Sequence, residues 1–213
     1  MTTSKKIAVI GTGNVGAALG TRLAQSGHAV VFGTRRPGEM GDLLGKAGSN
    51  ATAKLPSEAA AEAEVILLAV PAAAAVDAAK SLGDIAGKVL VDCNNSLRWD
   101  KGPVWNPPAE GSLTAAIAKA VPSARVVKAW NTFGAEFHAD PTTSEGPADL
   151  YMAGDDAEAK ALIAQIGESA GYRPVDAGPL RNAAVLENLA ILWIHLALAG
   201  GQGRNFAFRM ARR

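Results

Sequence analysis

The chain is poor in several kinds of residue, and each shortage excludes a class of protein. Its 213 residues include one cysteine, Cys93, so no disulfide forms within the chain. Aromatic residues make up only 5% of the chain, charged residues 19%, and the formal net charge is +1. Without a block of like charges there is no electrostatic reason to expect nucleic acid or an anionic membrane as a partner. We therefore expect a globular protein that binds neither.

Several sequence signals are also missing. The first apolar run after Lys6 covers only residues 7–10, too short for a secretory signal, and with the single cysteine this indicates a reducing cytoplasm. No Gly-x-Ser-x-Gly elbow, Cys-x-x-Cys motif or His-x-x-x-His pair occurs, so hydrolase chemistry and a metal site lack support. We expect a cytoplasmic protein without a bound metal.

What is present is an alternation of short apolar runs and helical patterns, which is typical of a parallel sheet covered on both faces. Strands are predicted over residues 7–11, 29–34, 65–70, 89–94, 126–130, 150–153 and 173–176. The clearest helices are predicted over residues 15–25, 72–82, 113–120 and 157–170. The pattern predicts an α/β fold of the Rossmann type: a doubly wound, mostly parallel sheet with a small C-terminal helical segment.

A glycine-rich turn, "GTGNVG", lies between the first predicted strand and the first helix. Gly11 permits the tight turn, Gly13 lets a pyrophosphate approach the backbone, and Gly16 lets helix and strand pack closely. The helix N-terminus adds N–H donors and a partial positive charge. The motif predicts a dinucleotide-binding turn, and we include the residues between the glycines in the site, namely Thr12, Asn14 and Val15.

The end of the second predicted strand indicates which dinucleotide binds. An NAD-binding protein usually places Asp or Glu there to hold the ribose 2′-hydroxyl, and this chain has none. Thr34, Arg35 and Arg36 instead offer a hydroxyl and two guanidinium groups, which suit a 2′-phosphate. We predict NADP(H) as the cofactor, bound by residues 1–179 as one domain.

The remaining residues, 180–213, are predicted to form a C-terminal helix and tail that serve packing and association. The helix Leu180–Ala199 is apolar on almost every face, so it must be buried on all sides. Arg181, Glu187 and His195 interrupt it, which argues against a membrane span. We expect it to pack partly on the sheet and partly on a second subunit, giving a homodimer.

The reaction is less clearly marked, because no acid or base stands at a predicted strand tip. Asn131 and Thr132 follow the fifth strand and are candidates to touch cofactor or substrate, and His138 lies a little further on. Lys128 lies inside a strand and is not expected to take part. Hydride transfer to a flavin-like ring needs mainly stacking and orientation, whereas a carbonyl acceptor requires a proton donor. The sequence therefore favours a small-molecule, flavin-like hydride acceptor.

Four segments together resemble the NADP-dependent oxidoreductases of the deazaflavin coenzyme F420: "KIAVIGTGNVGAALGTRLAQSGHAVVFGTRRP", "LLAVP", "AGDD" and "GYRPVDAGPLRNAAVLENL". The resemblance spans nearly the whole chain. It implies hydride exchange between NADPH and F420, with Ala69, Val70 and Pro71 lining the nicotinamide side. This chain departs from the family by placing three alanines, Ala72 to Ala74, after the proline, so a different partner ring stays open.

The sequence also fits other functions. "VVKAWNTFGA" is similar to the nucleotide domain of the six-transmembrane ferric reductases, which indicates an NADPH-dependent flavin or ferric reductase. A non-catalytic NADP(H) sensor fits the nucleotide motifs alone. A dehydrogenase of the β-hydroxyacid or pyrroline-carboxylate type is disfavoured, because it would need a larger helical domain than the residues after Pro179 can form. The connector at 94–111, with Trp99 and Trp105, is either a lid over the acceptor or a loop packed on the surface.

Overall fold

The fold is organised around one eight-stranded sheet. The structure, a computed structural model, describes residues 4–211 and 213. The strands are β1 (Lys6–Ile10), β2 (Ala29–Gly33), β3 (Ala51–Lys54), β4 (Val65–Leu68), β5 (Val89–Asp92), β8 (Arg125–Lys128), β11 (Asp149–Gly154) and β12 (Arg173–Asp176). They lie in the order β12-β11-β8-β5-β4-β1-β2-β3. Strands β1 to β5 and β8 run parallel to one another, and β11 pairs antiparallel with β8. The predicted Rossmann-type fold is confirmed.

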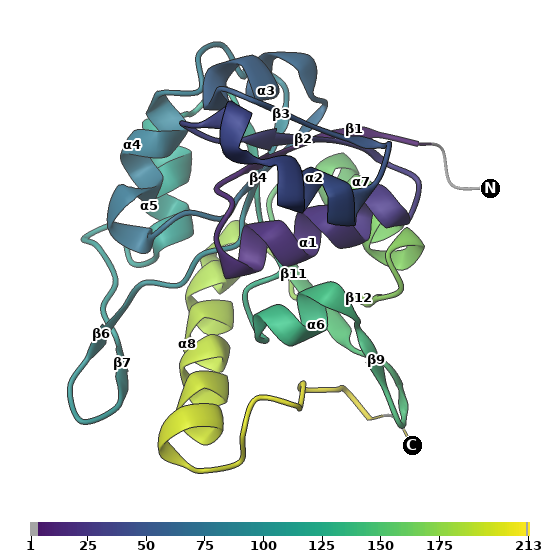
Figure 1. Cartoon of the computed structure of the whole chain (residues 1–213). Helices are drawn as coiled ribbons and strands as arrows, with labels where there is room; N and C mark the ends of the chain where they lie inside the picture. The colour runs from purple at the N-terminus through teal and green to yellow at the C-terminus, as the bar shows by residue number, and fades with distance from the viewer. Residues whose placement is uncertain (1–3, 212) are drawn as a thin grey trace.

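Helices cover both faces because successive strand residues point to opposite sides. Ile7 and Val9 of β1 pack with helices α1 (Asn14–Gln25), α2 (Gly41–Ala47), α6 (Ala135–Ala139) and α7 (Ala157–Ser169). Ala8 and Ile10 pack on the other face with α3 (Pro56–Glu62), α4 (Ala75–Lys80) and α5 (Leu113–Ala120). The two layers are visible in Figure 1. Burial on both faces explains why these strands are continuous apolar runs in the sequence.

Some elements differ from the sequence-based expectation. The edge strand β3, "ATAK", was not predicted, because it is only partly buried and carries no apolar run. The predicted helix at 72–82 begins instead as a 3-10 turn, η2 (Ala72–Ala74), and becomes α-helical only in α4. The short helices α2, α3 and α6 were not predicted either, because they lack a clear apolar period.

The topology creates a cleft at a defined place. Strand β1 pairs with β2 on one side and with β4 on the other, so the chain winds away from β1 in two directions. In doubly wound sheets, ligands bind beside the carboxyl ends of the strands at such a switch point. The turns after β1 and β4 therefore frame the place where a ligand is expected.

The C-terminal segment forms η3 (Leu180–Asn182), α8 (Ala183–Ile194) and a π-helical turn, η4 (His195–Ala199). One face of it packs on the domain through Ala183, Leu186, Glu187, Ala190 and Trp193. Val185, Leu192 and Leu198 are 62%, 48% and 50% exposed, so this chain by itself covers one face of the helix, and burial of the other face on a second subunit stays a prediction. By length and composition Leu180–Ala199 is apolar enough to cross a membrane, and a third of that stretch is buried inside the protein.

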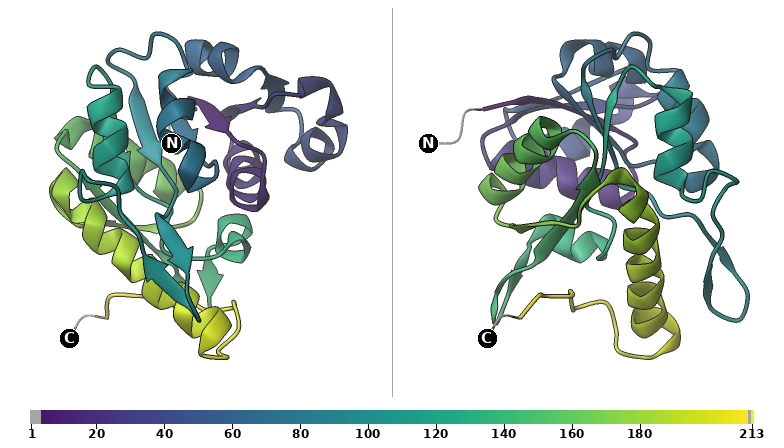
Figure 2. Two further views of the ribbon diagram at one scale, coloured as in Figure 1. Left: turned by 90° about the vertical axis from the view of Figure 1, so that its left-hand side faces the viewer. Right: turned by 180° about the vertical axis from the view of Figure 1, so that it is seen from behind.

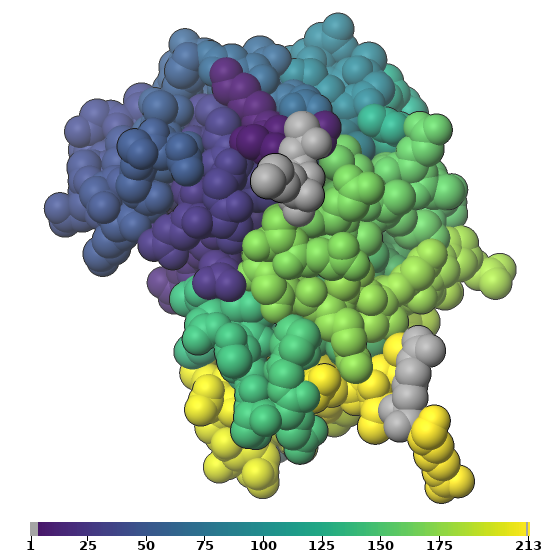
Figure 3. Space-filling model, turned by 90° about the vertical axis from the view of Figure 1, so that its right-hand side faces the viewer, coloured from purple at the N-terminus to yellow at the C-terminus, as the bar shows by residue number. Residues whose placement is uncertain are grey.

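Two hairpins and a tail complete the molecule. Strands β6 (Leu97–Trp99) and β7 (Pro103–Trp105) form a hairpin that packs beside α8, and Figure 2 shows both extending beyond the sheet. The C-terminal tail then lies against the small hairpin of β9 (Thr142–Thr143) and β10 (Gly146–Pro147), as Figure 3 shows. Its contacts include Met210 N, which donates to Asp149 at 2.6 Å.

Candidate active site

A cavity of about 1030 Å³ opens at the carboxyl ends of β1, β2, β4 and β5, the position the topology indicates. Ten of the twelve residues predicted to bind cofactor line it, and Gly16 and Arg36 do not. The ten are Gly11, Thr12, Gly13, Asn14, Val15, Thr34, Arg35, Ala69, Val70 and Pro71. The structure thus brings three separate sequence motifs into one cavity.

Each glycine of the turn meets a different constraint. Gly11 has a φ of +100°, and a Cβ there would overlap the carbonyl oxygen of Ala69. A Cβ at Gly16 would overlap the carbonyl oxygen of Gly11, so Gly16 serves packing beneath the cavity. At Gly13 a Cβ would meet no protein atom within 4 Å, so this side of the backbone is open to a ligand.

The N-terminus of α1 has the features of an anion-binding site. Gly13 caps the helix without a side chain, and no acidic residue occupies the first turn. The first N–H groups and the positive end of the helix dipole are therefore not neutralised by the protein at this point. A phosphate group suits this position.

The end of β2 presents Thr34 and Arg35 to the cavity. Arg35 forms no ion pair among the described residues, whereas Arg36 pairs with Glu39 at 3.0 Å on the exposed surface. The backbone N–H of Arg36 donates to Thr34 Oγ1 at 3.3 Å, which helps to shape the turn. Of the two arginines, Arg35 is thus the better placed to meet a 2′-phosphate.

The segment directly after β5 supplies lining residues that were not among the predicted site residues: Cys93, Asn94 and Asn95. Asn94 Oδ1 accepts a hydrogen bond from the N–H of Val70 at 3.0 Å. Burial raises the pKa of the Cys93 thiol well above its usual range, so it stays protonated. An asparagine pair directly after a buried strand was the signal available for these residues.

Asn131 and Thr132 are buried behind the cavity rather than on its surface. Asn131 Nδ2 donates to Asn95 Oδ1 at 2.8 Å, and Asn95 Nδ2 donates to the Asn131 carbonyl at 2.8 Å. Trp130, just before them, is buried with a φ of +55°, a backbone conformation that costs about 1–3 kcal/mol. Asn131 therefore supports a lining residue from behind.

His138 lies away from the cavity. It is fully buried on α6, with its ring centroid 5.0 Å from that of Phe133. Neither ring nitrogen has a hydrogen-bond partner among the described residues. Burial lowers the pKa of the ring from 6.5 to about 3, so the imidazole is neutral at physiological pH. In this arrangement it is not a proton donor to a ligand in the cavity.

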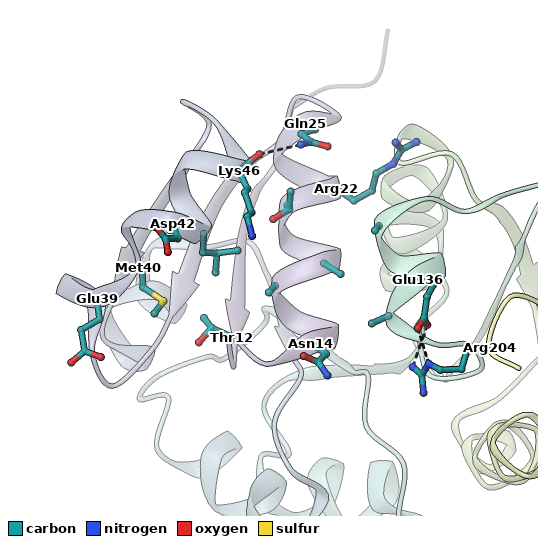
Figure 4. Close-up of a pocket in the computed structure, with 16 residues that line it drawn as sticks. Thr12, Asn14, Arg22, Gln25, Glu39, Met40, Asp42, Lys46, Glu136 and Arg204 are labelled. Carbon is teal, nitrogen blue, oxygen red and sulfur yellow. Dashed lines mark hydrogen bonds and ion pairs between the residues drawn. The ribbon is translucent and has the colours of Figure 1, made fainter. Parts of the chain in front are cut away.

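A second cavity, of about 870 Å³, adjoins the first at Thr12 and Asn14, which line both. It lies between α1, α2 and α6, and Figure 4 shows its charged residues. Arg204 of the C-terminal tail reaches Glu136 of α6 there, with Nε 2.6 Å from Oε1. The two cavities thus meet at the glycine-rich turn.

Comparison with known proteins agrees with this geometry. A family model described as NADP oxidoreductase, coenzyme F420-dependent, matches residues 6–96, which contain the turn, the Arg35 strand end and the asparagine pair. The F420-dependent NADP reductase of Methanothermobacter marburgensis is 33% identical over 218 residues, covering 90% of this chain and 92% of that protein. The chain belongs to the family of F420-dependent NADP reductases.

Two further relatives extend the comparison. A crystal structure from Arthrobacter sp. FB24, assigned as an F420-dependent NADP-reductase, superposes with a TM-score of 0.88 at 34% identity, covering 98% of this chain and all of that one. Metalloreductase STEAP3 of Rattus norvegicus is 30% identical over 187 residues, covering 87% of this chain but 36% of its own length. The resemblance to ferric reductase nucleotide domains is thereby confirmed.

Membership in this family makes the chain an NADP-dependent oxidoreductase. The residues present fit NADP(H): Gly13 leaves the backbone open, the first turn of α1 carries no acidic residue, and Arg35 lines the cavity at the end of β2 without an ion pair to any described residue. The 94–111 connector, by contrast, forms the β6–β7 hairpin, and apart from Asn94 and Asn95 it does not line this cavity.

Proposed function

We propose that the chain transfers hydride between NADP(H) and a flavin-like ring, and that its acceptor is the deazaflavin coenzyme F420. The observation that carries the proposal is the chemistry of the cavity wall. At the ends of β4 and β5 the lining consists of small apolar residues, a protonated thiol and two amides. No histidine, lysine or tyrosine is among the lining residues, and the one carboxyl group, that of Asp77, is exposed and pairs with Lys80 at 3.7 Å.

This wall suits a reaction in which the protein donates no proton. Hydride transfer moves two electrons and one proton from the nicotinamide carbon to a ring carbon of the acceptor. The second proton needed by the reduced ring comes from water. Reduction of a carbonyl develops charge on an alkoxide, which ordinarily requires a positioned acid worth 10²–10⁴-fold in rate. The wall therefore favours a flavin-like acceptor over a carbonyl.

The adjoining second cavity supports the same proposal. A deazaflavin carries a long polar tail, which needs room beyond the reacting ring. The second cavity offers Arg22, Lys46 and Arg204 as cations, together with three carboxylates. Because it meets the first cavity at the glycine-rich turn, it is a suitable place for the acceptor's polar part.

The acceptor is tested by anaerobic mixing of the full chain and NADPH with F420, FMN, FAD or ferric citrate in turn. Oxidation of NADPH should be fastest with F420. Faster turnover with FMN, FAD or ferric citrate would replace the proposed acceptor and favour the alternative, a flavin or ferric reductase, which the similarity to Metalloreductase STEAP3 supports. Binding of NADPH without turnover on any acceptor would favour the sensor interpretation.

A pair of neighbouring substitutions tests where the acceptor sits. Ala72 lines the cavity beside Pro71, whereas Ala73 is exposed and does not line it. Ala72→Trp should lower turnover with F420 on the order of tenfold or more, because it fills the space beside the reacting ring. NADPH affinity should change little, since Arg35 lies elsewhere. Ala73→Trp is the matched control, and equal loss in both variants would contradict the placement.

A further inference from the structure

Three ionisable side chains are buried together behind the cavity. Asp92 at the end of β5, Lys128 at the end of β8 and Glu187 on α8 are each 0% exposed. Lys128 Nζ lies 2.9 Å from Asp92 Oδ2 and 3.7 Å from Glu187 Oε1. Two carboxylates and one ammonium leave a formal charge of −1 in the interior. Apolar residues of similar size are often as stabilising as such clusters, so stability alone does not account for this one.

The contacts of Asp92 lead to the cavity wall. Its Oδ2 accepts from Lys128 and, at 2.7 Å, from Thr114 Oγ1 on α5. Its Oδ1 accepts from Asn94 twice, from the backbone N–H at 3.0 Å and from Nδ2 at 2.8 Å. Lys128 Nζ also donates to the carbonyl of Asn94. The side chain of Asn94 is thus held in one orientation, with Oδ1 free to accept from elsewhere.

Oδ1 of Asn94 is the atom that holds Val70. Because Asp92 occupies Nδ2, Asn94 presents Oδ1 to the N–H of Val70 at 3.0 Å. Val70 lies between Ala69 and Pro71 in the wall on which the nicotinamide side is expected. A shift of about 1 Å in such a surface is enough to cost on the order of a hundredfold in rate.

We infer that Asp92, held by Lys128 and Thr114, is a positioning residue for hydride transfer: it orients Asn94 and so fixes the Ala69–Pro71 wall. Asp92 touches neither cavity, so it acts only through Asn94. The inference rests on the oxidoreductase activity but not on the identity of the acceptor.

Glu187 provides a matched control because it shares the ion pair with Lys128, at 3.7 Å, but its hydrogen bonds go elsewhere. Its two oxygens accept from Trp105 Nε1 at 2.8 Å and from the N–H of Leu113 at 2.9 Å, which ties the β6–β7 hairpin and α5 to α8. Asp92→Asn and Glu187→Gln each remove one negative charge from the same buried cluster and leave it formally neutral. Only Asp92→Asn changes the bonds to Asn94.

The first experiment needs no acceptor. Amide hydrogen exchange at Val70, followed by NMR, should become about tenfold faster in Asp92→Asn, as expected when one hydrogen bond is weakened. In Glu187→Gln the Val70 amide should exchange as in the wild type. Equal exchange at Val70 in all three proteins would overturn the inference, whatever the acceptor turns out to be.

The second experiment measures turnover with the best acceptor of the wild type. In Asp92→Asn, kcat should fall on the order of tenfold to a hundredfold with the KM for NADPH nearly unchanged. The isotope effect with NADPH deuterated at the transferred position should rise, because hydride transfer becomes slower. If Glu187→Gln lowers kcat and raises the isotope effect equally, the role of Asp92 is only structural and the inference fails.

Thr114 keeps the inference testable if Asp92→Asn does not fold. Thr114→Val removes one hydrogen bond to Asp92 without changing a charge, whereas Thr114→Ser retains the hydroxyl. The valine variant should show a several-fold lower kcat and faster exchange at Val70, and the serine variant should restore both. Unchanged kcat and exchange in Thr114→Val would overturn the inference.

Discussion

Replacement of His138 by leucine tests two consequences of the burial of this ring. One concerns the free energy of unfolding, and the other concerns catalysis. His138 is fully buried, and both of its ring nitrogens lack partners among the described residues. An unpaired polar group in the interior costs about 1–3 kcal/mol. Leucine removes that cost. It also removes the imidazole, which the folded protein keeps unprotonated. At pH 7.5 we expect His138→Leu to be at least as stable as the wild type.

The pH dependence of the unfolding free energy gives the magnitude of the effect of His138. Burial lowers the pKa of His138 from 6.5 to about 3. As the pH falls below 6.5, the unfolded chain binds a proton that the folded chain does not, so folding stability decreases. Each pH unit costs about 1.4 kcal/mol, and at pH 5 the wild type should have lost about 2 kcal/mol through this one group. The loss levels off only near pH 3.

Urea unfolding at pH 7.5 and pH 5 measures the effect. The fall in unfolding free energy between the two should be about 2 kcal/mol smaller in His138→Leu than in the wild type, because other groups contribute equally to both. His28→Leu is the contrast: its nitrogens are paired with Lys5 N at 3.2 Å and Ser169 Oγ at 2.7 Å, so it should lose stability at pH 7.5. The same pH dependence in His138→Leu and the wild type would refute the reasoning.

The same variant examines catalysis. Because His138 does not line the cavity and is neutral, His138→Leu should lower turnover with a saturating flavin-type acceptor by no more than about tenfold, below the usual contribution of a general acid. A loss beyond about a thousandfold with NADPH affinity unchanged would instead indicate acid catalysis on a carbonyl or imine.

Three further outcomes are expected. Arg35→Ala should weaken NADPH roughly ten- to a hundredfold and NADH little, since a bond to a charged group contributes about 1.5–3 kcal/mol; equal losses in a calorimetric titration would refute the 2′-phosphate role. Gly16→Ala should destabilise the fold by about 1–3 kcal/mol through overlap with the backbone, whereas Gly13→Ala should destabilise it less, as a poorer N-cap only, and weaken NADPH. The exposed apolar face of α8 is proposed to pair with a second copy, so Leu192→Asp should dissociate the dimer in sedimentation; a monomeric wild type would contradict the pairing.

The sequence alone determined the features that depend on neighbouring residues. The order of strands and helices, the turn at Gly11 to Gly16 and the guanidinium of Arg35 at a strand end are all local patterns, because backbone conformation and burial on both faces of a strand constrain residues close in sequence. These patterns predicted the Rossmann-type fold and the residues of these motifs that line the first cavity. They also predicted the family, since its motifs are short and continuous.

Only the tertiary structure decided what lies behind and around that wall. Asn94, Val70 and Asp92 come together because β4 and β5 are neighbours in the sheet, and Lys128 joins them because β8 lies beside β5. Burial of His138 depends on what packs over α6, and exposure of Leu192 depends on which face of α8 the sheet domain covers. Burial and hydrogen bonding between distant segments are set by packing, and an apolar or polar letter in the sequence does not specify its partner.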